Sequence, residues 1–128
     1  MKPFEHTAAS SKSFDDAVAA VVAITADKGF RVLHVHDVAA TLAEKGFTRD
    51  PLKIIEICNA RYASEVLKRD IRVALMLPCP ISVYVDAGRT YISTLLPGMI
   101  ADFFPGTGMD EVAARVEKAV LEIVEEAS

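Results

Sequence analysis

Hydrophobic residues are spaced along this chain in two ways, and the change from one spacing to the other predicts its secondary structure. A spacing of three to four residues, typical of an amphipathic helix, is clearest in 14–28 and 109–127. Between these helices, short stretches that are rich in β-branched residues or that alternate with polar residues are typical of strands. The pattern predicts strands at 2–9, 30–35, 52–58, 81–85 and 90–96, and helices at 14–28, 38–45, 60–69 and 109–127.

Residues that start and stop helices mark the boundaries of these elements. Ser13, Asp37 and Asn59 each stand where a side-chain oxygen can accept a hydrogen bond from the first turn of the following helix. Gly29 follows the first helix and readily adopts the left-handed conformation that ends helices. The segment Asp86-Ala87-Gly88 is so short that its two flanking strands must form an antiparallel hairpin.

Two segments do not follow either spacing. Ile71 to Leu77 is apolar throughout most of its length, and we interpret it as an extended segment that Pro78-Cys79-Pro80 interrupts. Residues 97–108 contain prolines and glycines and are predicted to be irregular, although they are unusually apolar for a connection.

The order of the elements predicts the fold class. Strand, helix, strand, helix, strand, helix, hairpin and helix together indicate an α+β fold, with a mostly antiparallel or mixed sheet and helices packed on one face. A chain of 128 residues has the usual length of one domain, and we expect a single domain over 1–128.

Charge and composition exclude several classes of function. The net charge of −4 leaves no basic surface for the phosphates of a nucleic acid. No apolar run approaches the roughly 18 to 20 residues that cross a bilayer, and the amino terminus lacks the apolar stretch of a secretory signal. We therefore expect a cytoplasmic protein that does not bind membranes. Phosphate-binding loops, nucleophile elbows and closely paired metal-binding cysteines are missing from the sequence, which identifies no enzyme class, cofactor or metal site.

Several short motifs together resemble the domain of unknown function 302 family. They are 57–63, which reads ICNARYA, then 75–79, which reads LMLPC, and the apolar strand at 81–85. Gly29-Phe30 and Asp37-Val38 are similar to the first half of that family, so the resemblance covers roughly residues 14–96.

The resemblance implies more about fold than about function. Members of the family are small domains whose sheet is covered by helices, similar to the TATA-binding-protein type of fold, and their biochemical role is undefined. Five positions of this chain carry over as candidate ligand-binding residues: Asp37, Cys58, Asn59, Pro78 and Cys79.

The two cysteines are the best chemical indication in the sequence. A helix over 59–69 would carry the chain back by about 16 Å, and an extended segment over 71–77 would return it by about 23 Å, which brings Cys58 and Cys79 to the same edge of the sheet. Cys58 would then precede a helix amino terminus, which favours a thiolate. The alternative is that both residues are small hydrophobic parts of the core, as unpaired cysteines often are.

Other polar candidates have simpler explanations. His34 and His36 lie on one face of a predicted strand and could hold a metal ion, but we favour two partly exposed histidines at a sheet edge. Asp37 is first a helix cap, since a general base would also need a cleft and a partner. Asn59 is likewise a cap whose amide could orient a ligand.

The segment from Leu95 to Phe104 is too apolar to face water uncovered. It could pack within the molecule, form a dimer interface, or lie as a flap over an apolar ligand. We expect a homodimer, because two-fold self-association is the commonest assembly of small proteins.

These observations leave two hypotheses for function. We prefer a non-enzymatic, dimeric ligand-binding or interaction module, with an apolar site near Cys58, Cys79 and the Phe103-Phe104 loop, that takes a small apolar ligand. The alternative is a thiol-dependent redox or detoxification protein, in which Cys58 attacks and Cys79 resolves.

Overall fold

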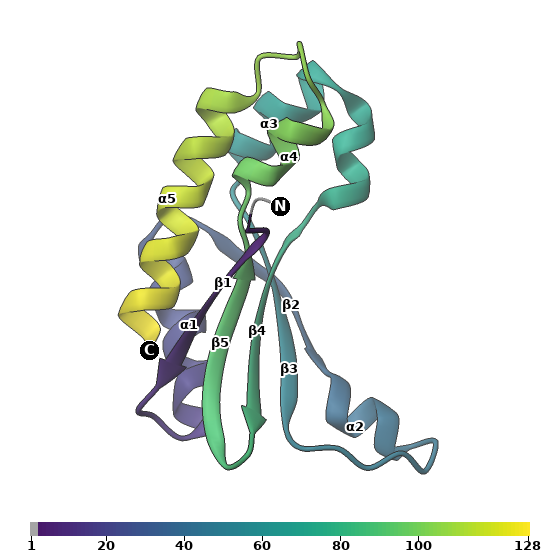
Figure 1. The fold of residues 1–128 in the computed structure, drawn as a ribbon, viewed down its shortest axis with the longest axis vertical. Coiled ribbons are helices and arrows are strands. Elements are labelled where there is room, and N and C mark those ends of the chain that lie inside the picture. The colour runs from purple at the N-terminus through teal and green to yellow at the C-terminus, as the bar shows by residue number, and fades with distance from the viewer. Residues whose placement is uncertain (1–2) are drawn as a thin grey trace.

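The computed structural model describes residues 3–128, and its centre is one antiparallel sheet. Five strands lie in the order β1-β5-β4-β3-β2, and every neighbouring pair is antiparallel. The helices are arranged around this sheet as Figure 1 shows. The elements in chain order are β1 (Glu5–Ser10), α1 (Phe14–Asp27), β2 (Arg31–Asp37), α2 (Val38–Ala43), β3 (Leu52–Cys58), α3 (Ala60–Arg69), the 3₁₀ helix η1 (Ile71–Met76), β4 (Cys79–Asp86), β5 (Arg89–Leu95), α4 (Gly98–Phe103) and α5 (Asp110–Ala127).

Two helices cover one face of the sheet and bury its apolar side chains. The helix α1 packs on β3, β4 and β5, and α5 packs on β1, β5 and α1. Between them and the sheet lie fully buried residues of both, among them Val21, Ile55, Ile81, Ile92 and Val120. The predicted α+β class, with an antiparallel sheet and helices on one face, is confirmed. The likeness to the TATA-binding-protein type of fold stays a prediction.

The remaining helices lie at the ends of the sheet. Figure 1 shows α3, α4 and η1 together beyond one end of the strands, and α2 near the opposite end. The first turn of α4 is held to α5, because the Gly98 N–H donates to the Glu117 carboxylate at 3.0 Å. Among residues 3–128, no helix combines the length and the apolar character that crossing a membrane requires.

The predicted helix starts and the hairpin are confirmed. Ser13, Asp37 and Asn59 each accept a hydrogen bond from a backbone N–H of the first turn that follows. The hairpin turns at Ala87 and Gly88, both of which have a positive φ, as a tight turn that matches the twist of its strands requires.

Four predicted segments differ from the structure. The segment predicted as extended at 71–77 is the 3₁₀ helix η1, whose first turn is capped because the Arg72 N–H donates to the Asp70 carboxylate at 2.9 Å. The strand β4 begins at Cys79, so that Pro80 lies within the strand. The region predicted as irregular at 97–108 contains the short helix α4. The first strand is shorter than predicted, and the predicted residue Lys2 lies outside the described residues.

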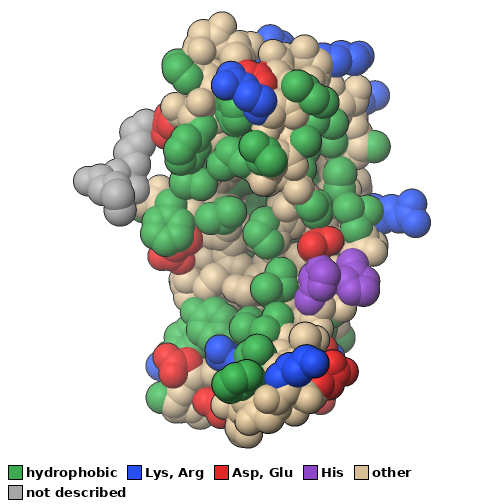
Figure 2. All heavy atoms as spheres, turned by 90° about the vertical axis from the view of Figure 1, so that its right-hand side faces the viewer, with side chains coloured by type: hydrophobic (Ala, Val, Ile, Leu, Met, Phe, Trp, Pro, Cys, Tyr) green, Lys and Arg blue, Asp and Glu red, His purple; other side chains and the backbone are tan. Residues whose placement is uncertain are grey.

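The second face of the sheet lies opposite α1 and α5. It presents partly exposed residues of β3, β4 and β5, such as Ile54, Ser82 and Ser93, and Tyr84 stacks on Tyr91 with ring centroids 5.6 Å apart. Figure 2, which views the side turned away from α5, shows this face as a hollow with hydrophobic side chains around it.

His34 and His36 lie on β2, an edge strand, and both are exposed. Their rings are 4.3 Å apart, and His36 Nε2 lies 2.8 Å from the Glu56 carboxylate. Within residues 3–128, no group of three or more histidine, cysteine and acidic side chains is placed to hold a metal ion. The arrangement supports our interpretation of this pair as partly exposed histidines at a sheet edge.

Candidate functional site

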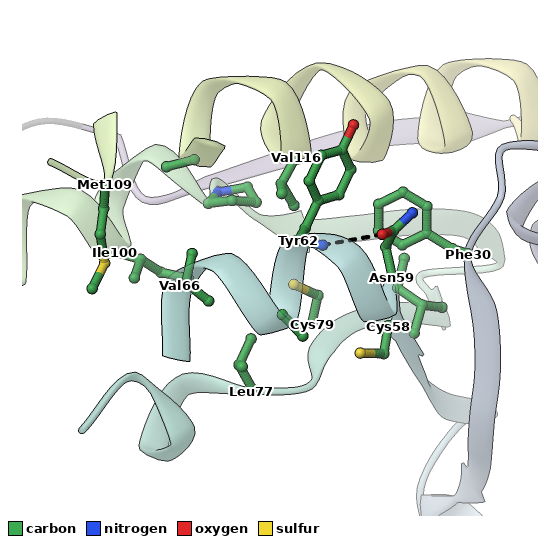
Figure 3. Close-up of a pocket in the computed structure, with 14 residues that line it drawn as sticks. Phe30, Cys58, Asn59, Tyr62, Val66, Leu77, Cys79, Ile100, Met109 and Val116 are labelled. Carbon is green, nitrogen blue, oxygen red and sulfur yellow. Dashed lines mark hydrogen bonds between the residues drawn. The ribbon is translucent and has the colours of Figure 1, made fainter. Parts of the chain in front are cut away.

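The two cysteines line one cavity at the end of the sheet where α3 begins. Cys79 is the first residue of β4 and pairs with Ile57 of β3, so it stands beside the strand position that precedes Cys58. Side chains alternate along a strand, but β3 ends at Cys58 and the chain turns into α3, which lets both thiols face the same space. Figure 3 shows both sulfur atoms near the first turn of α3.

We call this cavity the inner pocket. It is small, about 40 Å³, and its walls are almost entirely apolar. They come from Phe30, just before β2, and from β3, α3, β4, α4 and α5, which meet here because α3 and α4 both pack against α5. The residues that line the inner pocket are Phe30, Ile57, Cys58, Asn59, Tyr62, Ala63, Val66, Leu77, Cys79, Pro97, Ile100, Met109, Ala113 and Val116.

A second, larger cavity lies beside the inner pocket, and we call it the outer groove. Its volume is about 210 Å³, and it shares Cys79, Pro97 and Ile100 with the inner pocket. Its remaining walls come from η1, β4 and the chain that leads into α4. The residues that line the outer groove are Leu75, Met76, Cys79, Pro80, Leu95, Leu96, Pro97, Met99 and Ile100. The two cavities are therefore neighbours, and Cys79 lines both of them.

The apolar surroundings keep both thiols protonated. Burial raises the pKa of Cys79 to about 11, with a further contribution from the nearby Cys58. Burial also raises the pKa of Cys58 above the usual value for a thiol. The amino terminus of α3 favours a negative charge, but at Cys58 the cost of removing the charge from water outweighs it. Neither thiol is therefore activated as a nucleophile at neutral pH.

Asn59 joins three parts of the site through one side chain. Its Oδ1 accepts from the Tyr62 N–H at 3.2 Å, which caps α3, and its Nδ2 donates to the Gly29 carbonyl at 3.1 Å. The second bond ties the start of α3 to the chain that enters β2. Asn59 thus fixes where α3 begins relative to Cys58 and Phe30, the residues on either side of the inner pocket.

The other predicted site residues are not brought to the inner pocket. Asp37 ends β2 at the far end from Arg31, which pairs with Cys58, so roughly 20 Å of strand separates Asp37 from the thiols. It caps α2 instead. Pro78 follows a cis peptide bond between η1 and β4, and it lines neither cavity.

The Phe103-Phe104 loop is likewise not part of either wall. Phe103 is largely exposed, and Phe104 packs on the core, where the Arg72 guanidinium lies 5.4 Å from its ring centroid. The apolar segment that contains them supplies Pro97 and Ile100 to the inner pocket in their place.

Most of the cavity wall was not identified from the sequence. Figure 3 shows Tyr62 and Val66 reaching the inner pocket from α3, with Met109 and Val116 lying beside it. Each has the spacing of an ordinary core residue, and only the fold reveals that the packing leaves a space between them. The apolar character of 97–104 was the one signal that pointed to part of this wall.

We predict that both thiols react slowly in the native protein. With a pKa of about 11, Cys79 is thiolate in only about one molecule in 10⁴ at pH 7. Alkylation by iodoacetamide should accelerate about tenfold per pH unit from pH 7 to 9, and both residues should react quickly in urea. Peptide mass spectrometry would measure the two rates separately, and rapid native labelling at pH 7 would contradict the prediction.

We predict that the two hydrogen bonds of Asn59 contribute separately to stability. Asn59→Ala removes both and should lower the free energy of unfolding by about 2 kcal/mol. Asn59→Asp keeps the cap and removes the bond to Gly29, so it should cost about half as much. Asp37→Ala is the matched control for loss of a cap alone, at about 1 kcal/mol. Urea denaturation measures all three; a change under 0.5 kcal/mol for Asn59→Ala would show that this side chain does not hold the site.

Comparisons with known proteins agree with this fold. The model of the family described as Domain of unknown function DUF302 matches residues 6–127, a longer stretch than the motifs had indicated. The chain is similar to a solved crystal structure of an uncharacterized conserved DUF302 protein from Bacillus stearothermophilus, with 28% identity and a TM-score of 0.93 over 99% of this chain and 100% of that one. No curated protein matches the chain. With a family model that spans nearly all of its length, the chain belongs to the DUF302 family of domains of unknown function.

Proposed function

We propose that this protein is a non-enzymatic binding module that takes a small apolar ligand in the outer groove and the inner pocket. The observation that carries the proposal is the composition of the cavity walls. Apart from Cys58, Cys79 and Tyr62, the residues that line the two cavities have no ionisable side chain. A site that has no charged group and no pair of proton donor and acceptor favours apolar contacts over acid–base chemistry.

The size of the cavities limits the ligand. Typical small-molecule pockets have roughly 300–1,000 Å³. The inner pocket, at about 40 Å³, has room for the end of an alkyl chain, whereas the outer groove, at about 210 Å³, has room for the rest of a small molecule. A linear ligand that passes Cys79 would occupy both.

The alternative, a thiol-dependent redox or detoxification protein, receives less support. Attack by Cys58 requires its thiolate, and burial raises the pKa of this thiol. Burial and the proximity of Cys58 also raise the pKa of Cys79, which makes it a poor leaving or resolving thiolate.

The cytoplasmic location stays a prediction.

The ligand proposal predicts that 1-hexanol, a neutral linear probe, binds at the two cavities. Ala63→Leu should fill the inner pocket, because Ala63 lines it from α3. Losing the burial of about two methylene groups should weaken hexanol binding roughly 15-fold. Ala60→Leu, at an exposed position of the same helix, is the matched control and should leave the affinity unchanged.

Two-dimensional ¹⁵N–¹H NMR titration would measure both affinity and location. The expected shifts are confined to amides around the two cavities, such as those of Val66, Ile100 and Met109. Shifts spread over the surface, or equal affinities for Ala63→Leu and the wild type, would overturn the proposal.

A homodimer is also part of the proposed function. Its support is an exposed apolar surface on η1 and α4, where Ile71, Leu75 and Phe103 are 71%, 88% and 63% exposed. The two helices lie against each other here, since Leu75 and Met99 line the same groove. A second copy that covered this surface would also close the outer groove. Exposed apolar surface of this kind marks interaction sites.

We predict that replacing Leu75 by a charged residue dissociates this dimer. Leu75→Glu would place a carboxylate at the centre of the proposed interface, and it should weaken dimerisation at least about tenfold. Phe47→Glu is the matched control, because Phe47 is 65% exposed but follows α2 at the other end of the molecule. Sedimentation velocity over a range of concentrations would measure both; a monomeric wild type, or dissociation by Phe47→Glu alone, would contradict this interface.

A further inference from the structure

The two cavities gather the sulfur atoms of the chain. Cys58, Cys79 and Met109 line the inner pocket, and Met76 and Met99 line the outer groove beside Cys79. These five are all the cysteines and methionines among residues 3–128, although they come from five different parts of the chain. The fold therefore collects soft sulfur donors in one apolar region and places both thiols in the wall of the inner pocket.

We propose that Cys58 and Cys79 together bind one Cu(I) ion through their two sulfur atoms. Both thiols face the inner pocket from neighbouring strand positions, since Cys79 pairs with Ile57. Figure 3 shows both side chains beside the first turn of α3. Cu(I) is a soft ion that prefers thiolate and thioether ligands, and two thiolates are sufficient to hold it in linear coordination.

The surroundings favour Cu(I) over the commoner divalent ions. Zn²⁺ in structural sites takes four ligands, and the described residues contain no group of three or more histidine, cysteine and acidic side chains that could supply them. The walls hold no carboxylate, the oxygen ligand that hard ions prefer, and the Asn59 amide oxygen already accepts from the Tyr62 N–H. The apolar walls would also exclude water, which favours Cu(II) over Cu(I).

The fold provides compensation for the charge of the complex. A bis-thiolate Cu(I) centre carries one negative charge, and Cys58 immediately precedes the cap of α3, a helix of ten residues whose amino terminus favours an anion. Arg31 lies opposite Cys58 on β2 and adds a positive charge on the neighbouring strand. Tyr62 is the one other titratable side chain among the described residues that line the cavities.

Binding would release two protons and would change no oxidation state. Cu(I) plus two thiols gives the bis-thiolate complex and two H⁺, and the two Cu–S bonds replace the two S–H bonds. Because both thiols are protonated at neutral pH, the apparent affinity should rise about 100-fold for each pH unit between 6 and 8. The proposal does not rest on an apolar ligand, since it uses two sulfur atoms and not the volume of the cavities.

Anaerobic competition with the chromophoric complex of Cu(I) and bicinchoninate would test the proposal on the untagged full-length chain. The expected result is transfer of one Cu(I) per chain, with the pH dependence given above. Cys58→Ser and Cys79→Ser should each weaken binding more than about 100-fold. Met109→Leu, the matched control, removes a thioether from the same pocket and should retain Cu(I) binding. Ala63→Leu keeps both thiols and should also bind Cu(I), although it should bind hexanol weakly. Failure of the apolar-ligand proposal can therefore be distinguished from failure of the Cu(I) proposal.

X-ray absorption of the wild-type complex keeps the test independent of whether the variants fold. Two sulfur neighbours and no oxygen or nitrogen neighbour are expected around the ion. A shell that contains nitrogen or oxygen, undiminished binding by either serine variant, or no transfer of Cu(I) from the competitor would overturn the proposal.

Discussion

Burial of one face of the antiparallel sheet beneath α1 and α5 is the constraint on which the rest of this structure depends. Both helices contribute aliphatic side chains to the core cluster that contains Ile55, Ile81 and Ile92, and all three of these strand residues are inaccessible to solvent. This coverage does not extend past the end of β3 and β4. There the chain must cover the core with shorter elements: α3 and α4 pack on α5, and η1 packs on α3. Short helices that meet at angles fill space less completely than a helix laid on a sheet, and the inner pocket lies where they meet.

The place where these short helices meet also contains one fixed polar side chain, Asn59, in an otherwise apolar site. Asn59 satisfies the first turn of α3 and the carbonyl of Gly29 with its single amide group. Buried polar groups are costly unless they are paired, and this one is paired on both sides. The inner pocket can therefore stay apolar on every other side, which in turn raises the pKa of the two thiols.

Features that depend on local chemistry could be predicted from the sequence. The caps at Ser13, Asp37 and Asn59 and the turn at Ala87-Gly88 are set by residues within a few positions, and the structure has each of them. The prediction of an extended segment at 71–77 was wrong because a short apolar run suits a strand and a helix equally, and Asp70 decides between them by capping η1. Of the site, Cys58, Asn59 and Cys79 could be predicted to lie together, although the chain returns from α3 to Cys79 through the 3₁₀ helix η1 and not through the extended segment that was predicted. The parts of the cavity wall that come from α4 and α5 could not be predicted, because their apolar residues are spaced as in any helix that packs on a core. Asp37 was a candidate only through the family motif, and a motif does not show at which end of a strand its residues lie.

The uncovered edges of the sheet raise a separate question, that of how the protein avoids pairing with other chains. The edge strand β2 has an irregularity between Val32 and His34, where its register against β3 shifts. A bulge of this kind leaves Leu33 out of step and spoils the regular ladder of N–H and C=O groups that an incoming strand would need. The adjacent hydrogen-bonded pair of His36 and Glu56 adds polar side chains on the same border. This strand is thus shaped to resist edge-to-edge aggregation, and the dimer proposed above would not use it, because that dimer forms through the exposed surface of η1 and α4.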